Sequence, residues 1–517
     1  MSIPAALAAT VAAHGDATAV VDGSLSLTYA ELAQRAREFA AALTASGIEP
    51  GDRVSIWAPN SAQWIVSVLG IFQAGATLVP INTRFKGVEA ADILLRGEVR
   101  ALITSTDFLG TDYLSMLRGT GVELPALTLT VVIEAAAPAG AITVDELLAR
   151  ATPASRDEVL TRIEKLGADD VSDILFTSGT TGLPKGVVQT HGRTLQVARD
   201  WVAMTGLRAG DRYLMVNPYF HMFGLKAGIL ACVVAGATML PEPVFDAGRA
   251  LERVAEEKVS VFPGAPTIYQ SLLEHPDRTG LDLSSLRVAV TGAADIPVEL
   301  IRRIMAELPF SVVVTGYGLT EGGTATATSP DDDATTVATT VGRARPGFEL
   351  RVVDTTGTDV AQGEPGEVLL RGGSIMSHYL DDPAATAATL SEDGWLSTGD
   401  LGVIDEHGCL RIVGRAKDMF IVGGFNAYPA EIENALLRHP DIAQAAVIGV
   451  PDERLGEVGM AFVVLREGAN AAPADLIAWS REQMANYKAP RVIELLDELP
   501  INATGKVQKD LLRARVS

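Results

Sequence analysis

Residues 174–186 read ILFTSGTTGLPKG, and this segment decides the fold. Three apolar residues, typical of a buried strand, run into a loop with four hydroxyl side chains, three glycines and one lysine, Lys185. Glycines let the backbone come close to a ligand and point its N–H groups inward, hydroxyls donate to phosphate oxygens, and the lysine adds positive charge. Because ligands in open α/β sheets bind beyond the carboxyl ends of strands, the segment predicts an α/β fold with a polyphosphate site at this loop.

The loop differs from the Walker A loop, whose pattern is G-x-x-x-x-G-K-[ST]. Pro184 precedes the lysine and Gly186 follows it. The alternative interpretation is a flexible surface loop rich in Ser, Thr and Gly. Such loops rarely follow an apolar strand directly, so phosphate binding is favoured, with these candidate residues: Thr177, Ser178, Gly179, Thr180, Thr181 and Lys185.

The rest of the chain alternates helical and strand patterns, which indicates mainly parallel sheets. Residues 28–43 have the apolar spacing of a helix, and residues 54–58 read as a strand. AGATLVP at 74–80 resembles AGATMLP at 235–241, and each copy follows an apolar, helix-like segment. Two similar α/β subdomains would produce this repeat; the alternative is that two buried units reached similar sequences independently.

Two further segments place turns beside the predicted phosphate loop. Apolar strands at 288–290 and 312–314 run into Thr291-Gly292 and into residues 315–318, TGYG. If both strands end there, their turns line one cleft with the phosphate loop.

Composition narrows the class of protein. A length of 517 residues predicts two or more structural units. The formal net charge of −22 disfavours nucleic-acid partners, because an acidic surface repels phosphate. Cys232 and Cys409 form no CxxC pair, and the first basic residue is Arg35, so we expect a cytoplasmic protein without a signal peptide. The apolar run at 64–81 is interpreted as a buried helix, a Gly turn and a core strand, not as a membrane span.

The pattern of predicted strands and helices changes near the C-terminus. Residues 411–425 read RIVGRAKDMFIVGGF, and short strands and helices follow. We predict an N-terminal domain over residues 1–414, a hinge over 415–418 and a small α+β domain over 419–517.

These segments resemble a known family. Loops of the STSGTTG type that end in PKG are the signature of the acyl-adenylate-forming superfamily, which includes acyl-CoA synthetases, peptide-synthetase adenylation domains and beetle luciferases. Further motifs follow in the family's order: YGLTE at 317–321, STGD at 397–400, GR at 414–415 and NATGK at 502–506. The resemblance implies a large domain of two similar α/β subdomains with a small barrel-like part, followed by a small mobile domain. It also implies that ATP and Mg²⁺ activate a carboxylic acid as an acyl-adenylate, which then passes its acyl group to coenzyme A.

The resemblance assigns roles to single residues. Tyr317 would stack on adenine beside the turn Gly292-Ala293-Ala294, and Gly318 belongs to the same motif. Thr320 would contact the α-phosphate, and Glu321 would bind Mg²⁺, for which a carboxylate is a hard ligand. A further set binds the ribose and phosphate: Asp400 would accept the ribose hydroxyls and Arg415 would lie beside them.

The C-terminal motifs are assigned in the same way. Lys506 would bridge the substrate carboxylate and the α-phosphate, where a cation offsets the repulsion between two anions. Lys417 falls at the family's hinge position, about which the small domain would swing between the two half-reactions. In the thioester-forming pose, Gly423, Gly424 and Phe425 would flank coenzyme A.

Residues 217–224, NPYFHMFG, match the family's segment beside the acyl site, which makes His221 and Phe223 candidate pocket residues. A histidine among aromatic residues is otherwise a core residue. Lys226 lies in an apolar run, so either its amine reaches water or it meets a polar group on the substrate.

Strings around this segment, such as KAGILAC at 226–232 and PTIYQSLL at 266–273, resemble actinobacterial CoA ligases of steroid breakdown. That resemblance implies a bicyclic propanoate left from the sterol C and D rings as substrate. A medium-chain, alicyclic or aryl acid is the alternative, as is a carrier-loading adenylation enzyme; an adenylate-only ligase and a non-catalytic relative are disfavoured. A small-molecule carboxylate is the expected partner, and a homodimer is left open.

Overall fold

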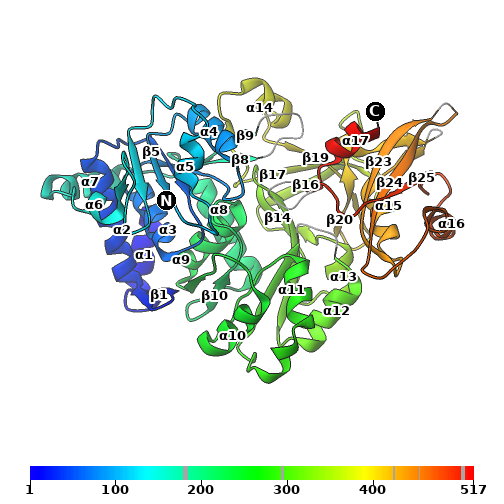
Figure 1. The fold of residues 1–517 in the computed structure, drawn as a ribbon, viewed down its shortest axis with the longest axis horizontal. Coiled ribbons are helices and arrows are strands. Elements are labelled where there is room, and N and C mark those ends of the chain that lie inside the picture. Colours follow the sequence, from blue (N-terminus) through cyan, green and yellow to red (C-terminus); the bar gives the residue numbers. More distant parts are fainter. Residues whose placement is uncertain (178–183, 293–295, 423–424, 453, 502–506, 517) are drawn as a thin grey trace. The chain divides into compact units, whose positions relative to one another are not determined.

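The computed structural model describes the chain except residues 178–183, 293–295, 423–424, 453, 502–506 and 517 (Figure 1). The chain divides into two units: residues 1–349 with 371–396, and residues 350–370 with 397–517. Each unit is a set of residues that contact one another more than they contact the rest of the chain. The domain boundary predicted at residues 414–418 stays a prediction.

The first unit contains an eight-stranded sheet in which parallel strands predominate. Its order is β18 (His378–Tyr379), β9 (Lys185–Thr190), β8 (Val171–Thr177), β4 (Thr77–Pro80), β3 (Arg53–Trp57), β5 (Ala101–Thr104), β6 (Leu129–Val132) and β7 (Ile142–Thr143). Strands β8, β9 and β18 pair antiparallel, and the pairs from β8 to β7 are parallel. The strand before the phosphate loop is therefore internal, and the loop lies between β8 and β9.

Two four-stranded sheets form the other part of this unit. One has the order β10 (Arg212–Met215), β11 (Thr238–Pro241), β1 (Thr18–Asp22) and β2 (Leu25–Thr28); the other has β12 (Val288–Gly292), β13 (Val312–Leu319), β14 (Gly323–Ala327) and β15 (Arg343–Ala344). Val261 bridges them through parallel pairs with Tyr213 and Val288.

Helices complete the first unit. They are α1 (Ile3–His14), α2 (Tyr29–Ala45), α3 (Ala62–Gln73), α4 (Gly87–Arg96), α5 (Tyr113–Arg118), α6 (Val144–Leu148), α7 (Pro153–Lys165), α8 (His191–Thr205), the π-helix η1 (Phe223–Leu230), α9 (Ala231–Ala235), α10 (Ala247–Glu257), α11 (Pro266–Glu274), the 3-10 helix η2 (Pro276–Gly280), α12 (Val298–Glu307), α13 (Ala334–Thr339) and α14 (Pro383–Thr389). The helix predicted at 28–43 is α2, which begins after a capping box made by Thr28 and Glu31.

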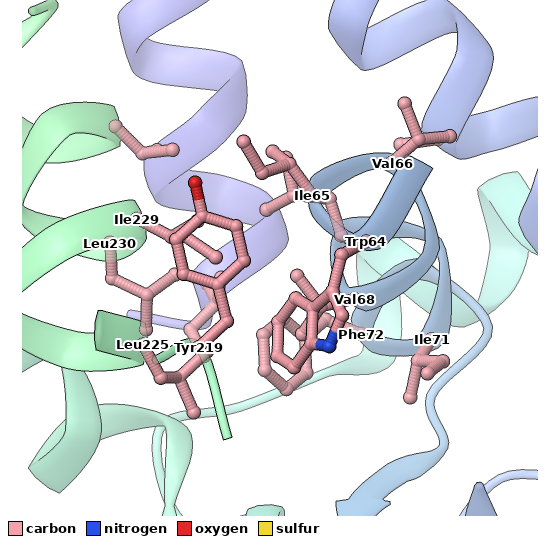
Figure 2. Close-up of a cluster of buried hydrophobic side chains, with 14 of the residues drawn as sticks. Trp64, Ile65, Val66, Val68, Ile71, Phe72, Tyr219, Leu225, Ile229 and Leu230 are labelled. Carbon is pink, nitrogen blue, oxygen red and sulfur yellow. The ribbon is translucent and has the colours of Figure 1, made fainter. Parts of the chain in front are cut away.

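The apolar run at 64–81 is buried, as predicted. It forms most of α3, a turn at Gly75 with φ of 75°, and β4. Figure 2 shows Trp64, Ile65 and Phe72 of α3 in one cluster with Tyr219 and with Leu225 of η1. Where the structure describes the chain, none of its helices has the length and apolarity to cross a membrane.

The repeated AGAT segments occupy equivalent places. Gly75 and Gly236 both end helices with positive φ, and β4 and β11 follow them in different sheets with parallel neighbours. The helical segment before the second copy differs from the expectation, because it begins as the π-helix η1 and becomes regular only in α9.

The turn expected at residues 315–318 is not a turn. Strand β13 continues to Leu319, because Tyr317 pairs antiparallel with Thr326 of β14. Gly318 permits this hairpin: a Cβ there would lie 2.3 Å from the Gly323 carbonyl oxygen.

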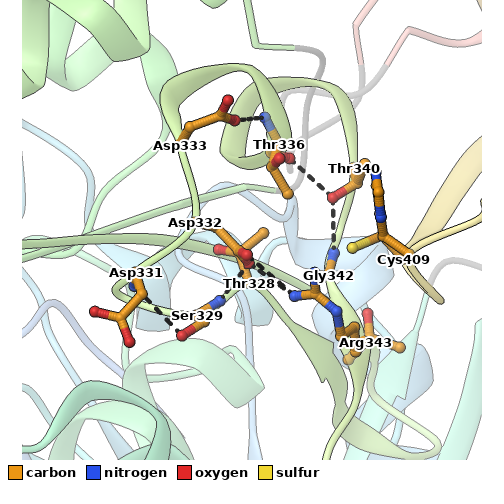
Figure 3. Close-up of polar contacts among 12 residues, drawn as sticks. Thr328, Ser329, Asp331, Asp332, Asp333, Thr336, Thr340, Gly342, Arg343 and Cys409 are labelled. Carbon is orange, nitrogen blue, oxygen red and sulfur yellow. Dashed lines mark hydrogen bonds and ion pairs between the residues drawn. The ribbon is translucent and has the colours of Figure 1, made fainter.

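The segment after β14 is held by local polar contacts (Figure 3). Asp333 caps α13 by accepting the Thr336 N–H at 2.7 Å, and Arg343 pairs with Asp332 at 3.0 Å. Thr328 accepts the Thr315 N–H at 2.9 Å. These contacts fix the hairpin that carries the second family motif.

The second unit contains most of a four-stranded sheet and a five-stranded sheet. The first has the order β16 (Phe348–Val353), β17 (Gly366–Gly372), β19 (Leu396–Ile404) and β20 (Leu410–Arg415). In the second, β22 (Phe425–Ala427), β21 (Phe420–Val422), β24 (Gly456–Leu465) and β23 (Ile442–Asp452) follow one another, and β25 (Val492–Leu495) pairs with β24. Its helices are η3 (Ala416–Asp418), α15 (Pro429–Leu436), α16 (Pro473–Gln483) and α17 (Lys509–Val516).

Candidate active site

The ends of the phosphate loop meet in the sheet. Thr177 closes β8 and pairs with Lys185, which opens β9. The Thr177 hydroxyl lies 3.5 Å from the Lys185 carbonyl oxygen. The other candidates of the loop lie outside the described residues: Ser178, Gly179, Thr180 and Thr181. The pairing of β8 with β9 therefore fixes Lys185 directly after the loop.

Thr320 and Glu321 lie in the turn between β13 and β14, which the Gly322 N–H closes onto the Leu319 carbonyl at 3.0 Å. Both residues are partly exposed, so each retains access to a ligand. Gly292 pairs with Gly316, so the first residue of the proposed adenine turn lies across from the residue that precedes Tyr317. Ala293 and Ala294 lie outside the described residues.

Tyr379 connects the lysine and the carboxylate. Lys185 Nζ lies 5.0 Å from the centroid of the Tyr379 ring, and the Tyr379 hydroxyl donates to Glu321 Oε1 at 2.9 Å. Strand β18 pairs Tyr379 with Val187, two residues after Lys185. Burial, and then the charge of Glu321, raise the pKa of Tyr379, so its hydroxyl remains a donor at neutral pH.

The segment before Tyr379 fastens the Glu321 turn to the sheet. The Met376 N–H donates to the Glu321 carbonyl at 2.6 Å, and the Ser374 hydroxyl donates to the Gly322 carbonyl at 2.8 Å. Gln189 of β9 donates to the Ser374 carbonyl at 3.3 Å. Sequence reasoning missed Tyr379, because HYLDD reads as an ordinary strand end and its partners are distant in the sequence.

These residues fit a magnesium ion. One Glu321 oxygen accepts from Tyr379, which leaves the other oxygen for a hard cation. Mg²⁺ keeps several waters and is bound by one or two carboxylates together with substrate phosphates. Among the described residues, no group of three or more His, Cys, Asp or Glu side chains could hold a metal by itself. Glu321 would thus hold the ion only together with bound phosphates.

The second unit brings together two further candidates. Asp400 and Arg415 are partners across β19 and β20, and Arg415 Nε lies 2.5 Å from Asp400 Oδ1. The Asp400 side chain is 7% exposed. A pocket of about 190 Å³ opens beside the pair, lined also by Gly414, Asp418 and Lys509. The proposed hinge residue Lys417 is exposed in η3.

Other C-terminal candidates are only partly described. Phe425 opens β22 and pairs through its backbone with Val422. Gly423, Gly424 and Lys506 lie outside the described residues.

The acyl segment at 217–224 is anchored from several sides. Asn60 donates to the Met215 and Asn217 carbonyls at 3.0 Å and accepts the Tyr219 N–H at 2.9 Å. Phe223 packs edge-on against Trp201, with centroids 5.0 Å apart. His221 is exposed, and its Nδ1 accepts the Phe223 N–H at 3.1 Å. His221 is therefore not a core residue.

The structure corrects the interpretation that the Lys226 amine reaches water. Its side chain is 0% exposed, so the amine does not reach water, and Nζ lies 2.8 Å from Asp173 Oδ1, which is also fully buried. Burial lowers the pKa of Lys226, and Asp173 opposes that shift. The charged partner of the lysine is therefore a carboxylate of the protein. The apolar spacing gave no sign of this partner, which lies on another strand.

Family models identify the class. The AMP-binding enzyme model matches residues 7–380, and the AMP-binding enzyme C-terminal domain matches residues 431–506. The chain belongs to the AMP-binding enzyme family. This confirms the predicted fold and reaction class, an AMP-forming acid–thiol ligase that uses ATP, Mg²⁺ and coenzyme A.

Particular relatives cover nearly the whole chain. Two ligases named 3-[(3aS,4S,7aS)-7a-methyl-1,5-dioxo-octahydro-1H-inden-4-yl]propanoyl:CoA ligase are 48% identical in Rhodococcus jostii and 49% identical in Mycobacterium tuberculosis, over 99% of this chain and 98% of each relative. The structure of ATP-bound MatB from Rhodopseudomonas palustris superposes with a TM-score of 0.87 at 30% identity, over 100% of this chain and 99% of MatB.

Replacing Tyr379 by phenylalanine tests the link between Lys185 and Glu321. The ring over Lys185 stays, but Glu321 loses a hydrogen bond to a charged group, which is worth about 1.5–3 kcal/mol, so we expect roughly tenfold lower kcat or more. The Mg²⁺ concentration at half-maximal rate should rise. A Mg²⁺ titration of acyl-CoA formation measures both.

Tyr113→Phe is the matched control, since that hydroxyl donates to the Thr83 carbonyl at 2.8 Å, far along the chain from these candidates. Wild-type Mg²⁺ dependence of Tyr379→Phe would show that Tyr379 does not position Glu321.

Proposed function

We propose that this protein joins coenzyme A to 3-(7a-methyl-1,5-dioxo-octahydroinden-4-yl)propanoate, the bicyclic acid in the name of both ligases above. The observation that carries the proposal is the 48–49% identity to them over nearly the full length of both chains. Tyr219 and Met222 of the acyl segment are buried and Phe223 is partly buried, and these apolar side chains suit a ring system of this kind.

In the first half-reaction, a substrate carboxylate oxygen attacks the α-phosphorus of ATP, and pyrophosphate leaves. The carboxylate is already ionised at neutral pH, so no general base is required. Lys185 and the hydroxyl-rich loop would hold the β- and γ-phosphates, and Tyr317 would stack on adenine. When bound at Glu321, Mg²⁺ would neutralise phosphate charge. Thr320 would contact the α-phosphate from the same turn.

Lys506 has the central role in that step. Two anions must approach each other, and a lysine that contacts both offsets their repulsion and stabilises the charge that develops in the transition state. Asp400 would accept the ribose hydroxyls while Arg415 holds its carboxylate in place at 2.5 Å.

In the second half-reaction, the thiolate of coenzyme A attacks the carbonyl carbon of the acyl-adenylate. The carbon–sulfur bond forms, the bond to the bridging oxygen breaks, and AMP leaves with that oxygen. We propose that residues 415–418 act as a hinge at Lys417 between domains 1–414 and 419–517. The exchange would replace Lys506 by Gly423, Gly424 and Phe425 at the site. The gap between the two family models, residues 381–430, includes this hinge.

Cys232 and Cys409 are both buried and neither forms a disulfide, which suits a reducing compartment, and we propose a cytoplasmic location for the enzyme.

A competition assay tests the substrate. The enzyme receives MgATP, coenzyme A and equal concentrations of the bicyclic propanoate, a medium-chain fatty acid and an aryl acid, and mass spectrometry identifies the thioesters. We expect the bicyclic acyl-CoA to dominate. Dominance of another thioester would contradict the proposed substrate, and an adenylate without thioester would indicate carrier loading.

A further inference from the structure

One buried ion pair lies outside the chemistry described above. Lys226 Nζ and Asp173 Oδ1 are 2.8 Å apart, and both side chains are 0% exposed. The other carboxylate oxygen of Asp173 accepts from the Ser172 hydroxyl at 2.7 Å and from the Thr194 hydroxyl at 2.6 Å. The carboxylate is therefore held from three elements: its own strand β8, helix α8 and η1.

Stability alone does not account for this pair. Removing two charges from water is costly, and replacing a buried pair by apolar residues of similar volume is often neutral or stabilising. Burial lowers the pKa of the nearby His191 to about 4, so that side chain is neutral at physiological pH. Lys226 is thus the cation that compensates Asp173, and the pair also fixes the position of the two side chains relative to each other.

The pair joins two segments of the candidate site. Asp173 lies on the internal strand β8, between Leu78 of β4 and Gln189 of β9, and β8 ends at Thr177 beside the phosphate loop. Lys226 lies in η1, which begins at Phe223 of the acyl segment. The ion pair therefore ties the acyl segment to the strand that leads into the phosphate loop.

Helix η1 has an uncommon geometry and packs directly against the acyl segment. A π-helix has i→i+5 hydrogen bonds, is rare, and occurs frequently at functional sites. Its first turn packs tightly on the acyl segment: a Cβ at Gly224 would lie 2.1 Å from the Pro218 carbonyl oxygen. Rewinding η1 to α-helical geometry would turn Lys226 away from Asp173 and shift the residues that contact Pro218. Strand β8, with a ladder on each side, would stay in place.

We propose that the Lys226–Asp173 ion pair is a positioning device for the acyl pocket, which holds the π-helical wall that begins at Phe223 at a fixed place on β8. The proposal rests on the function proposed above, because it takes the acyl segment to be the pocket wall. Lys226 acts through Asp173 and does not touch the acid.

Three variants separate positioning from stability. Lys226→Met leaves a buried carboxylate without its cation, so it should lower the melting temperature. Asp173→Asn with Lys226→Met removes both charges and keeps an acceptor for the two hydroxyls, so it should recover the melting temperature. Arg253→Met is the matched control, because it removes a buried cation that pairs with Glu242 at 2.9 Å, outside these segments.

Steady-state kinetics of acyl-CoA formation give kcat and the separate KM values for the acid and for MgATP, and the effects on the two substrates are compared. The double variant should lose roughly 100-fold in kcat/KM for the acid, the cost of a small misplacement near the reacting groups, with an unchanged KM for MgATP. Arg253→Met should leave both KM values unchanged. The loss should be alike for the dioxo acid and an analogue without ketones, because no direct contact to a ketone is involved.

Wild-type acid kinetics in the stable double variant would overturn the proposal, and so would an equal rise of the acid KM in Arg253→Met. A wild-type enzyme that uses another acid would contradict the proposed substrate only, and the same variants would then be measured with that acid.

Discussion

Replacing Lys506 by methionine is expected to lower the rate of adenylate formation by about 100- to 1000-fold, the usual cost of removing one group that stabilises a developing anion. The methionine keeps the length and apolar stem of the lysine but cannot carry a charge between the carboxylate and the α-phosphate. Thioester formation from a supplied acyl-adenylate should stay close to wild type, because the second half-reaction uses the other pose of the small domain.

Two assays measure these steps separately. Exchange of labelled pyrophosphate into ATP, with the acid and without coenzyme A, reports the first half-reaction, and thioester formation from synthetic acyl-adenylate reports the second. Lys488→Met is the control, because Lys488 lies in the same part of the chain and pairs with Glu431 at 2.5 Å. Wild-type exchange by Lys506→Met would contradict its assigned role.

Replacing Glu321 by glutamine is expected to reduce kcat by about 100-fold, because the charge that would bind Mg²⁺ is lost where phosphate charge must be stabilised. The amide oxygen can still accept from the Tyr379 hydroxyl, so the turn should keep its position. Excess Mg²⁺ should recover part of the rate, and MgATP should give a smaller thermal shift than with the wild type.

Glu349→Gln is the control for this change. It removes an exposed carboxylate that pairs with Arg371 at 2.6 Å, and an exposed pair contributes about 0–1 kcal/mol. If Glu321→Gln kept wild-type kinetics at limiting Mg²⁺, Glu321 would not be the metal ligand. The loss of kcat expected for Glu321→Gln is larger than the loss expected for Tyr379→Phe, because the carboxylate would bind the metal and the tyrosine only positions the carboxylate.

The sequence predicted what depends on local pattern. The burial of α3, the strand before the phosphate loop and the meeting of Asp400 with Arg415 follow from apolar spacing or from family motifs. The extension of β13 was not predicted, because Tyr317 and Gly318 read as a turn until the pairing with β14 is known. The same residue types occur in turns and in strands, and only the pairing of β13 with β14 shows that these residues belong to a strand.

Residues whose partners are distant in the chain were harder to predict. Nothing near Lys226 indicates Asp173, and nothing near Tyr379 indicates Glu321, because each contact joins two elements that are distant in the sequence and meet only through tertiary packing. The composition around both residues is ordinary. Long-range pairing of single polar side chains leaves no periodic trace, whereas a buried helix does.

An acyl-adenylate intermediate is the defining step of the reaction proposed for this chain. Acid labelled with oxygen-18 in its carboxylate, incubated with the enzyme, MgATP and coenzyme A, tests it by mass spectrometry of the nucleotide. We expect AMP that carries one heavy oxygen, because the oxygen that attacks the α-phosphorus leaves with AMP when the thiolate attacks. Unlabelled AMP, or ADP with the heavy oxygen in inorganic phosphate, would contradict it.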